Sequence, residues 1–436
     1  MDRVLQSEEV MASFPSARFD WLLACLVFAI GCGPHPPRMV PDAAGDDGGP
    51  ITIDSGPDED AGPIGDDAGT IDVDAGSEDL DGGPVVTDAA PADAGPSCEA
   101  GVRLDLLFMV DNSNSMTEEQ ASLAAQFPRL MRVLASGDLD GDGSEDFPPV
   151  ADMHVGVVTA DMGTAGFIVP TCADPSVGDD GILRTEGNTA IAGCAATHPA
   201  FLAFGAGDDT DALAGDFTCV AQMGTGGCGF EQQLEATLKA LTPSSSSLRF
   251  HAATRGHADG ANAGFLRGDS LVGVVMLTDE NDCSASDGEI FNPSSATYSG
   301  NLNLRCFSYP SALHPVTRYV AGLQAAVGDP ARLVFAAITG VPVDLVSDPS
   351  AIDYDAILAE ARMRETVDVS DPNRLTPSCN VPGRGLAFPP RRIVQTARDL
   401  ELAGSGTIVQ SICQADFTPA LDAIITRLAD RLPNCD

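Results

Sequence analysis

The chain is poor in basic residues. Its 436 residues include 23 Lys and Arg against 64 Asp and Glu, which gives a formal net charge of −41 at pH 7. Because contacts to phosphate groups need clustered Lys and Arg, so acidic a balance argues against binding to nucleic acid. The length allows either one large domain or two domains of ordinary size.

The sequence also lacks the short motifs of common hydrolases and zinc sites. His-Glu-x-x-His and Gly-x-Ser-x-Gly do not occur, and the six histidines do not have the spacing of metal ligands. His251 and His257 lie in a polar segment, where we expect them to be solvated. Cys-x-x-Cys is missing too, so the twelve cysteines indicate disulfides in an oxidising compartment rather than a zinc ribbon.

A short apolar run lies near the N-terminus. Trp21–Ile30 (WLLACLVFAI) follows Arg18 and precedes Gly31-Cys32. The run is too short to span a bilayer and is typical of a signal-peptide core. Its end, Ala29-Ile30-Gly31-Cys32, resembles a bacterial lipobox. That resemblance implies a lipoprotein signal peptide over residues 1–32, lipidation of Cys32, and an anchor in the outer membrane or at the cell surface.

Alternatives remain at this end of the chain. A plain secretory signal would give a secreted or periplasmic protein. The letters of Leu22-Leu23-Ala24-Cys25 fit a lipobox better, but they would leave almost no apolar core before the cysteine. Met11 is an alternative start, because Glu8 and Glu9 are unusual in the first part of a signal peptide.

Residues 33–97 differ sharply in composition from the rest. They are rich in Asp, Gly, Ala and Pro, and Asp-Ala-Gly recurs at 60, 67, 74 and 93, while Arg38 is the only base. So little apolar surface cannot offset the entropy of ordering, and like charges repel each other. We therefore expect an acidic disordered linker, which would hold the following domain away from a membrane.

Residues 98–436 alternate between strand-like and helical patterns. The near-continuous apolar runs are Leu104–Val110, His154–Thr159, Leu271–Leu277, Leu333–Ile338 and Thr407–Ile412. Helical periodicity is found over Thr117–Leu134, Phe230–Leu241, Leu313–Val327, Arg391–Leu402 and Thr418–Leu432. This order predicts an α/β fold: a doubly wound, mostly parallel central sheet with helices on both faces.

One segment carries most of the chemistry. In Leu104–Met116 (LDLLFMVDNSNSM), the apolar run is followed directly by Asp111, Ser113 and Ser115. A carboxylate and two hydroxyls are hard oxygen ligands, suited to Mg²⁺, Ca²⁺ or Mn²⁺. Open parallel sheets place ligands at the carboxyl ends of their strands, and these residues lie at such an end. An N-cap of the following helix is the alternative role.

The pattern D-x-S-x-S after such a strand resembles the metal-ion-dependent adhesion site of von Willebrand factor A domains. Leu271–Asp279 (LVGVVMLTD) resembles the segment that carries the family's second aspartate, with Glu280 in place of the usual glycine. The resemblance implies a bound metal that Asp279 reaches through water. It also implies that one coordination position is left for a protein or an acidic ligand.

The family's threonine has no clear equivalent. In Met223–Phe230 (MGTGGCGF) the usual alignment places Cys228 there, and Thr225 is the available substitute. The same segment satisfies G-x-G-x-x-G (Gly224, Gly226, Gly229). The residues before it are too polar for the strand that a dinucleotide site requires, so we do not favour that interpretation.

A second metal candidate follows the first predicted helix. Asp138, Asp140, Asp142, Ser144 and Asp146 have the spacing of an EF-hand-type calcium loop. The match departs at its twelfth position, where a proline replaces the bidentate glutamate. We expect Ca²⁺ at 138–146, with an acidic surface turn as the alternative.

Removal of the signal and the lipidated residue leaves ten cysteines, an even number. Sequence does not fix their connectivity. Proximity suggests Cys172–Cys194, Cys219–Cys228, Cys283–Cys306 and Cys379–Cys413, which leaves Cys98 for Cys435. The last pair would bracket the domain, as in some von Willebrand A domains. Compared with that family, surplus length falls near 160–218, 283–312 and 341–389, where we expect disulfide-pinned insertions that carry recognition or cap the sheet.

The order of lipobox, linker and domain resembles surface lipoproteins of the myxobacterial type, which carry large linkers. The leading hypothesis is therefore a cell-envelope lipoprotein that displays a metal-dependent binding domain and is not an enzyme. A secreted hydrolase that uses the acidic cluster and a metal is one alternative. A structural envelope protein with a vestigial metal site is another.

Overall fold

The computed structural model describes residues 101–382 and 385–433, all within one compact unit. The predicted signal peptide, Cys32 and the linker lie outside these ranges, as do Cys98 and Cys435. Within them, no helix combines the length and apolar character needed to cross a membrane.

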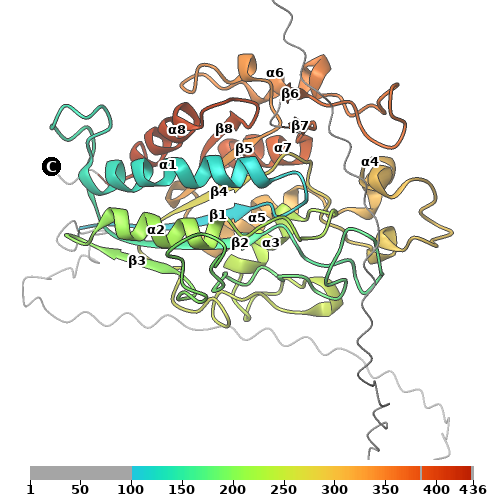
Figure 1. The fold of residues 1–436 in the computed structure, drawn as a ribbon, viewed down its shortest axis with the longest axis horizontal. Coiled ribbons are helices and arrows are strands. Elements are labelled where there is room, and N and C mark those ends of the chain that lie inside the picture. The colour runs from blue at the N-terminus through green and yellow to red at the C-terminus, as the bar shows by residue number, and fades with distance from the viewer. Residues whose placement is uncertain (1–100, 383–384, 434–436) are drawn as a thin grey trace, which may run out of the picture. The chain divides into compact units, whose positions relative to one another are not determined.

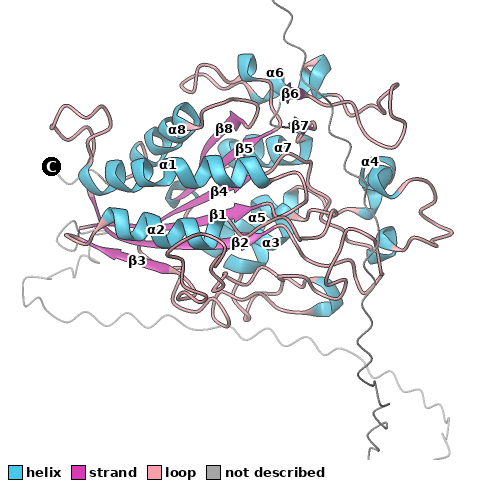
Figure 2. Ribbon diagram, in the orientation of Figure 1, coloured by secondary structure: helices cyan, strands magenta, loops and turns pink. Residues whose placement is uncertain are grey.

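Six strands form the central sheet in the order β3-β2-β1-β4-β5-β8 (Figure 2). They are β1 (Val102–Val110), β2 (Val150–Thr159), β3 (Leu202–Gly205), β4 (Leu271–Leu277), β5 (Leu333–Thr339) and β8 (Gly406–Ser411). All neighbours are parallel except β3, which pairs antiparallel with β2. Val110 is in register with Thr159 on one side and Leu277 on the other, so three strands end at one edge.

Helices cover both faces of this sheet (Figure 1). One face packs against α1 (Thr117–Ser136), α2 (Thr210–Ala221) and α8 (Thr418–Ala429). The other packs against α3 (Gln233–Leu241), α5 (Thr317–Val327), α6 (Tyr354–Ala359) and α7 (Arg391–Leu402). Alternation in β1 explains the division, because Leu106 and Phe108 point to the first core while Leu107 and Met109 point to the second. The predicted α/β fold is confirmed.

The five predicted strands and five predicted helices are present, with boundaries that shift by at most four residues. The structure adds β3 within 160–218, which the sequence treated as an insertion, and α2, which begins there and ends at Ala221. Both were missed for local reasons. The strand Leu202–Gly205 has only four residues, and α2 carries Gly and Asp within its turns. Segment 341–389 contains α6 and the small antiparallel pair β6 (Cys379–Val381) and β7 (Gly385–Ala387).

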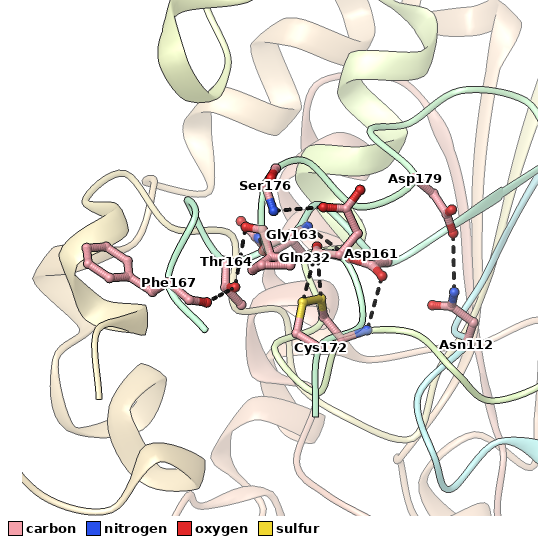
Figure 3. Close-up of a disulfide and its surroundings, with 12 residues drawn as sticks. Asn112, Asp161, Gly163, Thr164, Phe167, Cys172, Ser176, Asp179 and Gln232 are labelled. Carbon is pink, nitrogen blue, oxygen red and sulfur yellow. Dashed lines mark hydrogen bonds between the residues drawn. A yellow bond between two sulfur atoms is a disulfide. The ribbon is translucent and has the colours of Figure 1, made fainter. Parts of the chain in front are cut away.

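Two of the predicted disulfides are wrong. Cys172 bonds to Cys228 and Cys194 bonds to Cys219, whereas proximity in sequence had paired Cys172 with Cys194. The loop after β2 folds back against the glycine-rich segment before α3, which brings distant cysteines together (Figure 3). Cys283–Cys306 and Cys379–Cys413 are confirmed.

A buried ion pair ties the loop after β2 to α3. The Lys239 ammonium, 1 % exposed, contacts the carboxylate of Asp180. The His257 ring lies 2.9 Å from the same carboxylate, so His257 is paired rather than solvated as expected, while His251 is exposed. Burial would raise the pKa of Asp180, but the hydrogen bonds from His257 and Lys239 outweigh it and lower the pKa.

Candidate metal centre at the strand ends

Asp111 lies at the carboxyl end of β1 and is fully buried. Its backbone N–H donates to the Leu277 carbonyl at 3.0 Å, which continues the pairing with β4 for one more residue. The carboxylate accepts the Ser113 N–H at 2.8 Å on one oxygen and the Thr278 hydroxyl at 2.6 Å on the other. The side chain is therefore held rigidly between two strand ends.

The two serines follow in the turn before α1. Their hydroxyl oxygens lie 3.3 Å apart, with Ser113 buried and Ser115 exposed. The helix begins at Thr117 with Met116 at its N-cap and no capping bond from a side chain. The alternative role as an N-cap is therefore wrong for Asp111 and both serines.

Asp279 stands at the end of β4 and is 3 % exposed. Burial, then the charge of Asp111, raises the pKa of the Asp279 carboxyl to about 8, although a hydrogen bond with Ser115 lowers it. Its Oδ1 atom is buried and has no hydrogen-bond partner. The fold thus brings together Asp111, Ser113, Ser115 and Asp279, from segments more than 160 residues apart in sequence.

Thr225 does not join this group through any hydrogen bond in the described part of the chain. Its loop is held from both sides: Gly224 exchanges two hydrogen bonds with Gln120, and Gly227 donates to the Asn112 carbonyl at 2.9 Å. The disulfide to Cys172 removes Cys228 as a thiolate ligand. A helix, α2, precedes the loop instead of a strand, which counts against a dinucleotide site.

Sequence reasoning missed Glu231 as a neighbour of this group, and it noted Glu280 as a replacement for glycine and as part of the acidic cluster of the hydrolase alternative. Both side chains are partly buried. Burial, then the charge of Asp111, raises the pKa of Glu231 well above its ordinary value; burial, then the charge of Glu231, does the same for Glu280. Both glutamates line a cavity of about 360 Å³ together with Ser113 and Ser115. A glutamate just before a helix has no distinctive local pattern, so no sequence signal identified Glu231.

The predicted calcium loop lies elsewhere, between α1 and β2. One carboxylate oxygen from each of Asp138, Asp140 and Asp146 lies within 4.8 Å of the others. The two carboxylate oxygens of Asp138 accept the N–H groups of Gly141 and Gly143 at 2.7 and 2.9 Å. The remaining predicted ligands are Asp142 and Ser144, and the Ser144 N–H donates to Asp142 at 2.8 Å.

No family model matches this chain, and no curated protein matches it either. The interpretation of the site therefore depends on the residues themselves.

Proposed function

We propose that residues 98–436 form a metal-dependent binding domain of the von Willebrand factor A type. The observation that carries this proposal is the pair of buried aspartates, Asp111 and Asp279, which have no Lys, Arg or His in ion-pair contact among the described residues. Two buried carboxylates without a cation cost several kcal/mol. A divalent cation would neutralise both, and the Asp279 Oδ1 atom, which has no hydrogen-bond partner, would accept a hydrogen bond from a water on that cation.

The donor set fits a hard cation. Asp111, Ser113 and Ser115 offer oxygens from one rigid turn, and Asp279 offers a carboxylate from the neighbouring strand end. Mg²⁺, Ca²⁺ and Mn²⁺ prefer such ligands. Thr225 is the proposed ligand with the least support, since no hydrogen bond among the described residues joins it to the other four proposed ligands. The cation would leave room for an oxygen ligand from a protein or acidic partner.

We further propose display of this domain on the cell envelope. The proposed anchor lies in the outer membrane or at the cell surface, through lipidation of Cys32 after removal of the signal over residues 1–32. The lipobox-like end of that signal and the acidic linker support it. Secretion into the periplasm or medium is the alternative. The proposed role is adhesion or recognition without catalysis.

A second candidate is a metal-assisted hydrolase. The cavity next to Ser113 and Ser115 favours it, because Glu231 and Glu280 line that cavity and would supply a general base for a water that a bound metal activates. Hydrolytic turnover that disappears in Asp279→Ala and persists in Glu401→Gln would establish it. A structural envelope protein with a vestigial metal site would show neither turnover nor metal binding.

Ca²⁺ at 138–146 is a separate proposal, supported by the three converging carboxylates. This loop joins α1 to β2, so its expected role is to fix that connection.

The binding role is tested with the immobilised full chain and detergent-solubilised envelopes. We expect a partner to be retained in Mg²⁺, released by EDTA, and lost in Asp111→Ala. Retention that EDTA and Asp111→Ala leave unchanged would overturn the metal-dependent role. Asp140→Ala is the matched control, because it removes a carboxylate from the other candidate metal site.

A further inference from the structure

Two cavities of about 360 and 330 Å³ lie beside the strand ends and share part of their lining. Glu231 and Glu280 line both of them. Apolar side chains form part of the walls, Leu375 and Phe388 in the first cavity and Leu302, Phe307 and Leu313 in the second, beside polar and charged ones. Most of these residues come from the segments 283–312 and 341–389, which the sequence marked as insertions. The insertions thus build a partly apolar pocket around two glutamates.

The basic residues of this pocket are already neutralised by the chain itself. Arg374 pairs with Asp368 at 2.9 Å, Arg391 with Glu365 at 4.0 Å, and Arg392 with Asp282 at 3.0 Å. Glu231 and Glu280, in contrast, form no ion pair with any Lys, Arg or His within 101–382 and 385–433. Among the described residues, the pocket therefore holds two carboxyl groups that no basic side chain balances.

A metal at the strand ends would not remove this imbalance. One divalent cation balances Asp111 and Asp279, and the charges of Glu231 and Glu280 remain. The buried Asp279 Oδ1 atom, which has no hydrogen-bond partner, is a further unpaired acceptor at this edge of the sheet.

We propose that this pocket binds a basic side chain, lysine or arginine, of a partner peptide or protein. The two glutamates match the cationic head and the apolar walls match the aliphatic stem. A second metal ion fits less well. The described carboxylates that converge in threes lie in the Asp138 loop, and a cavity of about 360 Å³ exceeds the size of an ion.

This inference deepens the proposed function and rests on it, since the pocket adjoins the proposed metal site. It changes the expected chemistry of the partner, because an acidic ligand next to Glu231 and Glu280 would meet two like charges. The partner group in the pocket is therefore cationic, whatever oxygen ligand the metal takes.

The test is calorimetric titration of the full chain, in Mg²⁺, with an acetylated glycine peptide that carries one central arginine. We expect binding that weakens by at least about tenfold in the double variant Glu231→Gln/Glu280→Gln. Glu401→Gln, the same change on the exposed far end of α7, should leave the affinity unchanged. Since the double variant loses like-charge repulsion, its melting temperature should be no lower than that of the wild type. A loss of binding in this variant would therefore not result from unfolding.

A second peptide carries glutamate in place of the central arginine. Tighter binding of this glutamate peptide than of the arginine peptide, or full affinity for the arginine peptide in the double variant, would overturn the proposal. Spermidine that binds more tightly than the arginine peptide would overturn the assignment to a side chain, because it would identify a free polyamine as the ligand. The two proposals fail separately. If the peptide does not bind but Mg²⁺ still raises the melting temperature, only this inference fails. If the peptide binds through the two glutamates but Mg²⁺ does not change the melting temperature, only the proposed metal site fails.

Discussion

The Thr278 hydroxyl donates to the Asp111 carboxylate at 2.6 Å and joins the ends of β1 and β4. The same hydroxyl oxygen accepts the Gln233 side-chain N–H at 2.9 Å, so it also connects the start of α3. All three side chains are buried. Thr278 is thus the residue that holds the first aspartate in place, although it precedes the second one in sequence.

Replacement of Thr278 by valine tests this arrangement. The variant keeps the shape of the side chain and leaves the buried groups of Asp111 and Gln233 without their partner. We expect a loss of about 1–3 kcal/mol in the free energy of unfolding, measured by urea titration. Thr278→Ser, which keeps the hydroxyl, is the control and should recover most of the loss. Equal stability of the valine variant and the wild type would show that the hydrogen bond does not order this edge.

Asp180 and Lys239 give a prediction about stability at neutral pH. Asp180→Asn leaves the buried Lys239 ammonium without its carboxylate, and we expect a loss of about 3–5 kcal/mol. Asp180 has a positive φ of 57°, which asparagine tolerates, so backbone strain should not add to the effect. Urea unfolding at pH 7 measures it, and a loss below about 1 kcal/mol would mean that the pair is not buried in solution.

The same pair predicts a pH dependence. The pKa of Asp180 is lowered in the folded state, so its contribution is present above the ordinary value of about 3.9 and is lost as the pH falls through the folded pKa. The melting temperature of the wild type should therefore fall in that acidic window more steeply than that of Asp180→Asn. Parallel pH profiles of the two proteins would contradict the shift.

The loop at 138–146 should bind Ca²⁺ independently of the strand-end site. Asp138→Asn replaces with a neutral amide the carboxylate that also accepts the N–H groups of Gly141 and Gly143. Equilibrium dialysis should show one Ca²⁺ fewer per chain in this variant at a concentration that saturates the wild type. An unchanged Ca²⁺ count would assign the loop to an acidic surface turn.

The disulfide connectivity is also open to direct measurement. Non-reducing peptide mapping should find Cys172 joined to Cys228 and Cys194 joined to Cys219. Because the first bond closes a separation of 56 residues, chain entropy suggests that Cys172→Ala/Cys228→Ala costs about 4 kcal/mol. A linked Cys172–Cys194 peptide would restore the pairing that proximity in sequence favoured.

The sequence was sufficient for the parts of this fold that depend on local pattern. Strands β1 and β4 are long apolar runs, and parallel pairing necessarily brings the residues after them, Asp111 and Asp279, to one edge. Glu231 could not be found in this way, since its position depends on how the segment before α3 folds back. The disulfide of Cys172 depends on the same three-dimensional path, which spacing along the chain does not record.

The central claim is that Asp111 and Asp279 hold a divalent cation, and a Mg²⁺ titration of the full chain followed by thermal unfolding tests it most directly. At a concentration 100 times the Kd, binding should add about 2.7 kcal/mol to the stability of the folded chain. We expect the rise in melting temperature to be lost in Asp111→Ala and kept in Asp140→Ala. No rise in the wild type, or a full rise in Asp111→Ala, would contradict the account.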